Sequence, residues 1–117
     1  ADKRKLPVDI VTHHLHIHAF DNDTSKLLPH FHNIASFVSD ALNDGASVLI
    51  HCGAGVSRAP TATTAAIMWR YGLPAIDALR LVKQARSAAR PNLNFVQQLK
   101  DWENIVMLER GICVHAS

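Results

Sequence analysis

Residues 47–60 read SVLIHCGAGVSRAP, and this stretch decides how the chain is organised. It begins with a short apolar run typical of a strand, continues through a loop with two glycines, and enters a helical segment at Pro60. In such an arrangement the amides of the loop converge at the positively polarised N-terminus of the helix, where they bind anions. Cys52 opens the loop and Arg58 closes it. The stretch therefore predicts a thiolate nucleophile that faces an oxyanion.

The loop contains the residue types that phosphate chemistry needs. The ordinary pKa of a cysteine thiol is about 8.5, and the loop amides, the helix N-terminus and Arg58 all favour the thiolate form of Cys52. The guanidinium of Arg58 can hold a phosphate through two parallel hydrogen bonds, which a lysine cannot reproduce. Gly53 and Gly55 allow the backbone to approach the anion closely.

Further residues could assist the reaction. Ser57 can donate a hydrogen bond to the cysteine sulfur and so make it a better leaving group, and His51 can orient the loop through backbone contacts. The departing oxygen needs an acid. The carboxylic acids of Asp21 and Asp23 are the nearby candidates, and either could instead cap the helix that follows.

Composition and length indicate one globular domain over residues 1–117, with a charged lead-in at 1–7 and a tail at 111–117. The apolar fraction is 48% and the charged fraction 19%, typical of a protein with an ordinary core. The net charge of +2 does not demand nucleic acid as a partner. No apolar run reaches membrane-spanning length and no signal-peptide pattern opens the chain, so no membrane partner is expected.

The two cysteines, Cys52 and Cys113, do not form the framework of a disulfide-rich protein. We therefore expect a reducing compartment, the cytoplasm, with the nucleus as the alternative. Cys113 is expected to be a bystander, although it could trap an oxidised Cys52 as a disulfide. The chain begins with Ala1 rather than Met, which suggests a trimmed segment.

Hydrophobic periodicity predicts an α/β fold with a parallel-rich central sheet flanked by helices. Alternation predicts a strand over 14–19, with a further short strand over 8–12. The other predicted elements are a helix over 26–43 that stops at Gly45, a strand over 47–51, and helices over 60–71, 75–88 and 95–109.

The first strand, helix and second strand form a βαβ unit, whose strands run parallel with a right-handed crossover. Asp21 follows the end of the first strand and Cys52 the end of the second. Because sites in open α/β sheets form beyond the carboxyl ends of parallel strands, we expect both residues at the same edge.

The last two helices are expected to be amphipathic. In the helix over 75–88 the predicted core residues are Ile76, Leu79 and Val82, and the predicted outward residues are Arg80, Lys83 and Arg86. In the last helix the predicted core residues are Leu99, Trp102 and either Ile105 or Val106.

The order His51-Cys52, five residues, then Arg58-Ala59-Pro60 resembles the signature of the dual specificity branch of the cysteine-dependent protein phosphatases. Ordered flanking segments strengthen the resemblance, which covers roughly residues 14 to 105. These segments are Leu27-Leu28-Pro29-His30-Phe31, Val48-Leu49-Ile50, Ala78-Leu79, and Arg90-Pro91-Asn92 with Phe95, Gln98 and Leu99.

The resemblance implies a role for each matching residue. Cys52 would be the nucleophile that forms a phosphocysteine, Ser57 would assist its breakdown, and Asp21 would be the general acid and later the base, with Asp23 as the alternative. Asn92 and His51 would support the loop. The phosphoryl group would be bound by Arg58 and by the amides of the loop, contributed by Gly53, Ala54, Gly55, Val56, Ser57 and Arg58.

The implied protein is a phosphatase of phosphotyrosine and of phosphoserine or phosphothreonine in protein substrates, with no metal and no cofactor. Two other functions stay open: a phosphoprotein-binding module with weak turnover, and a phosphatase of RNA 5′-phosphates or phosphoinositides. The chain departs from the family in two respects. Family members usually carry further elements before the acid loop, so the N-terminal part looks shortened, and Asn94 stands where glycine is common.

Two clusters have both an ordinary and a functional interpretation. His14, His16 and His18 share one strand face, but three such positions spread over about 13 Å and do not converge on one ion. A polar strand face is the simpler interpretation. The basic residues Arg80, Lys83, Arg86 and Arg90 could dock an acidic partner, whereas a solvated helix face is the ordinary interpretation.

Overall fold

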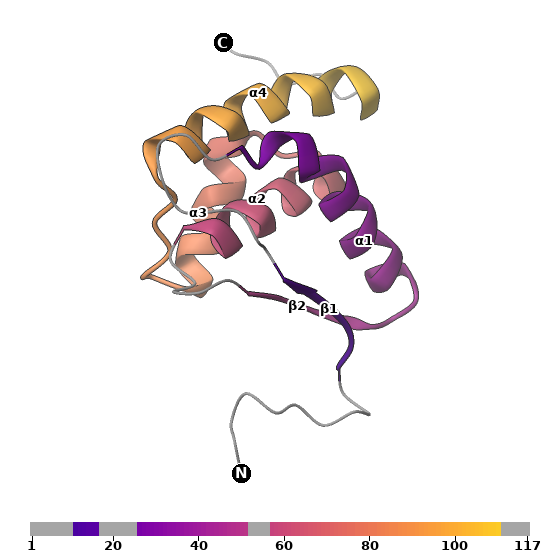
Figure 1. The fold of residues 1–117 in the computed structure, drawn as a ribbon. Helices are drawn as coiled ribbons and strands as arrows, with labels where there is room; N and C mark the ends of the chain where they lie inside the picture. The colour runs from indigo at the N-terminus through magenta and orange to yellow at the C-terminus, as the bar shows by residue number, and fades with distance from the viewer. Residues whose placement is uncertain (1–10, 17–25, 52–56, 111–117) are drawn as a thin grey trace.

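The computed structural model describes residues 11–16, 26–51 and 57–110. Its elements follow the order β1 (Val11–His16), a 3-10 turn (Leu28–His30), α1 (Phe31–Asn43), β2 (Ser47–His51), α2 (Arg58–Tyr71), α3 (Ala75–Ala85) and α4 (Leu93–Arg110). In Figure 1 the four helices gather on one side of the two strands. No helix among the described residues has the length and apolar character that a membrane span requires.

β1 and β2 are parallel neighbours, which confirms the predicted βαβ unit. Val11 lies opposite Ser47 and His16 opposite His51, with an irregularity between Val11 and His13. β1 therefore begins three residues before the strand predicted over 14–19, and it includes the end of the short strand predicted over 8–12. The alternating pattern alone does not set the limits of a strand, because the ladder extends only where a neighbouring strand is available for pairing.

Helix α1 forms as the periodicity predicts, with the apolar residues Phe31, Ile34, Ala35, Val38 and Ala41 buried along one face. The predicted start at residue 26 is too early, because a 3-10 turn containing Pro29 precedes the helix. The helix is followed by Gly45 at a φ of 77°, a conformation that glycine adopts without strain. Gly45 donates its N–H to the carbonyl of Leu42 at 3.0 Å, which confirms the predicted stop.

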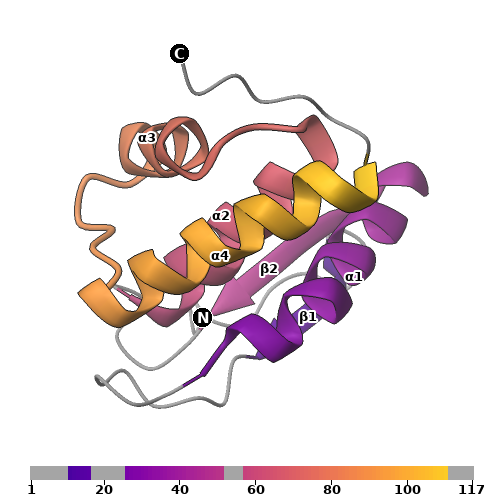
Figure 2. The same ribbon diagram turned by 90° about the horizontal axis from the view of Figure 1, so that it is seen from above.

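Helix α2 lies at the centre of the molecule, where α1, α3, α4 and β2 all contact it. Figure 2 shows α4 crossing over it. Its buried residues are distributed around its circumference: Ala59, Pro60, Thr61, Ala62, Thr64, Ala65, Ala66 and Met68. The hydroxyls of Thr61 and Thr64 donate to the carbonyls of Ser57 and Pro60 at 2.6 and 2.7 Å. These bonds satisfy polar groups that would otherwise be costly to bury.

The core is built on Trp102 of α4, which is fully buried. Its indole N–H donates to the carbonyl of Ala65 at 3.0 Å, and the ring of Phe31 meets it edge-on with centroids 5.6 Å apart. Leu99 and Val106 are also buried, as predicted, whereas Ile105 only packs against the edge of the core.

Helix α3 corrects two predictions about core residues: Leu79, predicted for the core, is only partly buried and does not belong to the core cluster, and Ile76 is exposed. The side chain of Ile76, predicted for the core, is 64% exposed, and the buried residues are Ala75, Ala78 and Val82. Small residues let α3 approach α2 closely, so packing between the helices selects the alanine face over the larger side chain. The helix also ends at Ala85 rather than at residue 88, while α4 begins at Leu93, two residues earlier than predicted.

Candidate active site

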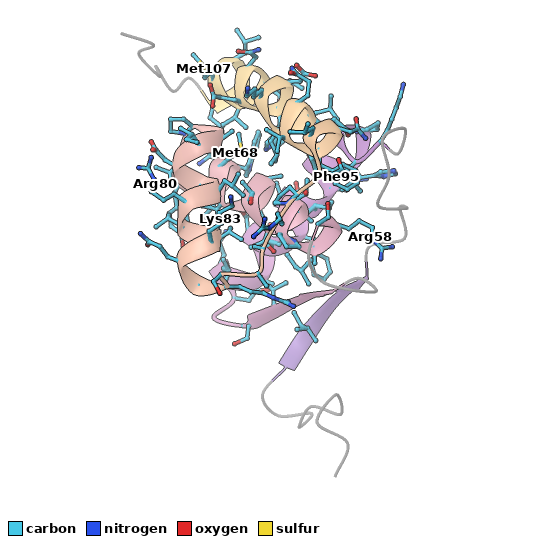
Figure 3. All side chains as sticks on the ribbon, turned by 90° about the vertical axis from the view of Figure 1, so that its left-hand side faces the viewer. Arg58, Met68, Arg80, Lys83, Phe95 and Met107 are labelled. Carbon is cyan, nitrogen blue, oxygen red and sulfur yellow. The ribbon has the colours of Figure 1, made fainter. Side chains whose placement is uncertain are left out.

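The predicted site lies where β2 ends at His51 and α2 begins at Arg58. The helix begins two residues before the predicted Pro60, so Arg58 occupies its first turn. This is the positively polarised end of the helix, where backbone N–H groups lack partners within the helix. The side chain of Arg58 is partly exposed, and Figure 3 shows it projecting away from α3.

Ser57 is almost completely buried, with 3% of its surface exposed, and it accepts hydrogen bonds at both its hydroxyl and its carbonyl oxygen. Its hydroxyl oxygen accepts a hydrogen bond from the backbone N–H of Asn92 at 2.9 Å. Its carbonyl accepts from the N–H of Thr61 at 3.0 Å and from the Thr61 hydroxyl. Accepting a bond uses a lone pair of the Ser57 hydroxyl and leaves its proton available for donation.

Asn92 connects this loop end to α4. Its side-chain oxygen accepts a hydrogen bond from the N–H of Phe95 at 2.8 Å, which caps the first turn of the helix. Its own N–H makes the bond to Ser57. Asn92 thus links Ser57 to the first turn of α4, with its backbone N–H as one donor and its side-chain oxygen as one acceptor.

Gln98 is a positioning residue to which the sequence pattern assigns no role of its own. The residue is 7% exposed, and its side-chain oxygen accepts hydrogen bonds from the N–H groups of Leu27 and Leu28 at 2.7 and 2.8 Å. Its amide nitrogen donates to the side-chain oxygen of Asn94 at 2.9 Å. The available signal was a glutamine next to Leu99, at a core-facing position of the helix.

The contacts of Gln98 matter because Leu27 follows the segment that contains Asp21 and Asp23. The same helix end thus holds Ser57 through Asn92, and the start of the α1 segment through Gln98. Asn94, where the family often has glycine, supplies the hydrogen-bond acceptor that orients Gln98. The first part of α4 thereby brings together the two chain segments that flank the predicted site.

Several predicted residues lie outside the described part of the chain. These are Asp21, Asp23, Cys52, Gly53, Ala54, Gly55, Val56, His18 and Cys113. The backbone of His51 ends β2 in register with His16. Among the described residues the structure brings together Ser57, Arg58 and Asn92. Across all the residues that the structure describes, no group of three or more His, Cys, Asp or Glu side chains lies close enough together to hold a metal ion.

Comparison with known proteins identifies the class. The family model described as "Dual specificity phosphatase, catalytic domain" matches residues 4–105. Human dual specificity protein phosphatase 9 is 39% identical over 97 residues, which are 83% of this chain and 25% of that protein. Human protein phosphatase Slingshot homolog 1 is 37% identical over 90 residues, 77% of this chain and 9% of that protein. The chain thus spans a quarter or less of the length of these relatives.

Solved structures agree with this class. The chain resembles the human tyrosine phosphatase-like serine/threonine/tyrosine-interacting protein with a TM-score of 0.81 and 28% identity, covering 90% of this chain and 86% of that one. Human DUSP28 superposes with a TM-score of 0.80 and 26% identity, covering 84% and 78%. The protein has the fold of the cysteine-dependent protein phosphatases. Within that superfamily, it belongs to the dual specificity phosphatase family.

Proposed function

We propose that this chain hydrolyses phosphotyrosine, and phosphoserine or phosphothreonine, in proteins through a phosphocysteine intermediate. The observation that carries the proposal is the hydrogen bond from the Asn92 N–H to the Ser57 hydroxyl. It fixes the last residue of the loop between Cys52 and Arg58 at the start of α2. A loop anchored in this way can present its amides and the Arg58 guanidinium to one phosphoryl group without reorganisation.

In the first step the Cys52 thiolate attacks phosphorus, so a sulfur–phosphorus bond forms and the bond from phosphorus to the substrate oxygen breaks. Asp21 gives its proton to the departing oxygen, and Arg58 with the loop amides stabilises the charge on the phosphoryl oxygens. Asp23 is the alternative acid. Gln98 holds the backbone of Leu27, which follows both aspartates in the sequence, through a hydrogen bond of 2.7 Å.

In the second step the Asp21 carboxylate takes a proton from water as the water oxygen attacks phosphorus. The sulfur–phosphorus bond breaks, and inorganic phosphate and the Cys52 thiolate are released. Ser57 donates its hydroxyl proton in a hydrogen bond to the departing sulfur. The structure supports this role because the Ser57 oxygen already accepts from Asn92, which limits the rotation of the hydroxyl.

Hydrolysis of a small aryl phosphate by wild type, Cys52→Ser and Asp21→Asn tests the mechanism. Wild type should turn over, Cys52→Ser should be inactive, and Asp21→Asn should lose the alkaline limb of the pH–rate profile because that limb reports the protonated acid. Asp23→Asn is the matched control and should keep that limb. Turnover that persists in Cys52→Ser would refute the phosphocysteine.

The same set of variants separates the enzyme from a binding module. A wild-type protein that binds a phosphopeptide without hydrolysing it would overturn the proposed activity. Matched peptides that carry phosphotyrosine, phosphothreonine or phosphoserine then test dual specificity. We expect phosphate release from all three. Release from the phosphotyrosine peptide alone would restrict the proposal to that residue.

A further inference from the structure

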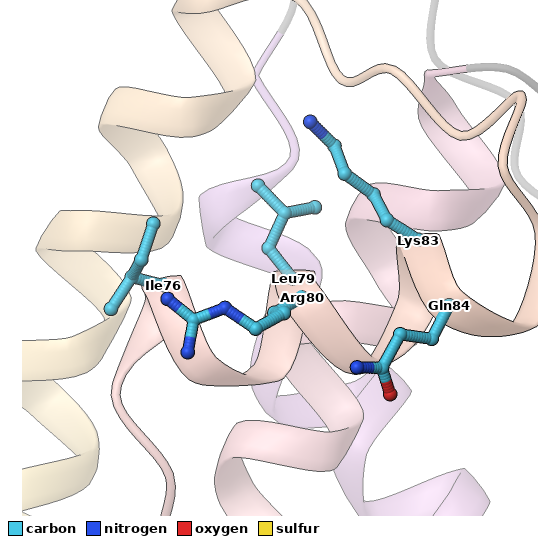
Figure 4. Close-up of a pocket in the computed structure, with 5 residues that line it drawn as sticks. All are labelled: Ile76, Leu79, Arg80, Lys83 and Gln84. Atoms are coloured by element: carbon cyan, nitrogen blue, oxygen red, sulfur yellow. The ribbon is translucent and has the colours of Figure 1, made fainter.

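The outward side of α3 combines apolar and basic side chains in one hollow. The residues Ile76, Leu79, Arg80, Lys83 and Gln84 line a shallow space of about 360 Å³, and we call these five residues the α3 outer face. In Figure 4 the Arg80 side chain lies along the helix toward Ile76, and Lys83 extends outward. All five residues come from this one helix.

The α3 outer face includes two aliphatic side chains that the helix does not bury in the core. α3 buries Ala75, Ala78 and Val82 but leaves Ile76 64% exposed, with Leu79 partly exposed beside it. A single exposed aliphatic residue needs no explanation. Here, however, Ile76, Leu79, Arg80 and Lys83 follow the spacing i, i+3, i+4 and i+7, which places them in one continuous stripe.

The charge around the face is strongly positive. Residues 77–90 contain four cations and one acidic residue, a net charge of +3, whereas the whole chain carries +2. The acidic residue, Asp77, approaches Arg80 at 3.7 Å, but both side chains are about half exposed or more. Such a pair is weak in water and leaves most of the positive potential in place. Within the described part of the chain, Lys83 has no ion-pair partner.

We propose that the α3 outer face is a docking site for a protein segment in which acidic side chains surround two aliphatic ones. Ile76 and Leu79 supply apolar contact area, and Arg80 and Lys83 complement carboxylates at its rim. The aliphatic residues favour a peptide over a nucleic acid. Phosphate groups gain nothing from contact with isoleucine and leucine, and the face has no aromatic side chain on which a base could stack.

This site is separate from the proposed active site. Figure 3 shows Arg80 and Lys83 on one side of the molecule and Arg58 on the other. A partner can therefore dock on α3 while a phosphoryl group occupies the loop. The docking goes beyond the proposed function, since it needs neither Cys52 nor Arg58 and survives if the enzyme proposal fails.

Fluorescence anisotropy of the full chain with a labelled helical peptide tests the proposal. The probe carries leucines four residues apart among glutamates, and the control peptide has glutamine in place of each glutamate. We expect binding of the first peptide with a Kd on the order of tens of micromolar, as for a small interface, and about tenfold weaker binding of the control. Binding should also weaken at high salt because exposed charges are screened.

Protein variants assign the binding to the α3 outer face. The double variant Arg80→Glu/Lys83→Glu should bind about tenfold more weakly and Ile76→Gln about threefold more weakly, as expected for a rim and a central contact. Lys100→Glu, a charge reversal at an exposed position of α4, is the matched control and should bind as wild type does. Hydrolysis of an aryl phosphate should be unchanged in all three variants.

Three outcomes would overturn the proposal. The first is no binding of the acidic peptide at millimolar protein, and the second is an equal loss of affinity in Lys100→Glu. The third is tighter binding of a single-stranded RNA oligonucleotide or of anionic lipid vesicles, with no effect of Ile76→Gln. That result would assign the basic residues to a polyanion rather than to a protein segment.

Discussion

The two ends of helix α4 contribute to the protein in different ways. Around the N-terminal end, Asn92 and Gln98 use hydrogen bonds to hold Ser57 and Leu27, the chain segments beside the proposed site. From its middle onward, Trp102 and Val106 bury apolar surface in the core, as Phe95 and Leu99 do nearer its start. Hydrogen bonds are directional and fix positions closely, whereas apolar burial is non-directional and mainly supplies stability. Changes at the two ends should therefore separate function from stability.

The largest expected effect is a loss of stability of the whole protein when Trp102, the buried ring in the middle of α4, is removed. Trp102→Ala should lower the free energy of unfolding by about 3–5 kcal/mol, because it removes a fully buried ring and leaves a cavity. Urea denaturation measures this loss. Trp102→Phe keeps most of the volume but loses the bond to Ala65, so it should cost less. Equal losses in the two variants would mean that burial of the ring is not the main contribution.

At the N-terminal end of α4, beside the proposed site, we expect a smaller loss of stability together with a loss of activity. Gln98→Leu leaves the N–H groups of Leu27 and Leu28 without their acceptor, which should cost about 1–3 kcal/mol. If the segment containing Asp21 then loses its position, kcat should fall most for aryl phosphates with poor leaving groups, since these depend on the general acid.

Gln98→Glu is the matched control for this experiment, because a carboxylate can still accept both hydrogen bonds. This variant should keep most of the wild-type activity, although it lacks the amide nitrogen that donates to Asn94. A uniform loss of kcat across good and poor leaving groups in Gln98→Leu would show that the residue contributes to stability without positioning the acid. Comparison of leaving groups thus sharpens the distinction between the two helix ends.

The smallest effect is expected at the far C-terminal end, where Glu109 pairs with His32 on the surface. Both side chains are about half exposed, so Glu109→Gln should change the free energy of unfolding by less than about 0.5 kcal/mol. Thermal unfolding at low and high salt measures the change. A loss comparable to that of Gln98→Leu would contradict the view that this end is stabilised mainly by the burial of Trp102 and Val106.

Residues near one another in the sequence specified much of this fold. The apolar spacing from Phe31 to Ala41 predicted α1, and Gly45 predicted its end. The strand–helix–strand order predicted the parallel pairing of β1 with β2. These features depend on local propensity and on general rules of chain connection, and both can be evaluated from the order of residues alone.

The face of α3 could not be predicted in the same way. Periodicity ranks Ile76 above the alanines as a core residue, because it weighs each side chain by hydrophobicity. The actual choice depends on how closely α3 can approach α2, and Ala75 and Ala78 permit the closer contact. Gln98 illustrates the same limit, because its side-chain oxygen accepts hydrogen bonds from two N–H groups that lie about seventy residues earlier in the sequence.

By itself, therefore, the sequence determined the order of the elements, the parallel strand pair, and the presence of Cys52, Ser57 and Arg58 in the one stretch that runs from the end of β2 into the start of α2. Only the tertiary structure decided that it is the backbone N–H of Asn92 that binds the Ser57 hydroxyl, that Gln98 holds the backbone of Leu27 and Leu28, and that α3 exposes Ile76. The physical reason is that hydrogen bonds and close helix packing depend on distances between remote segments. Such distances exist only once the chain has folded.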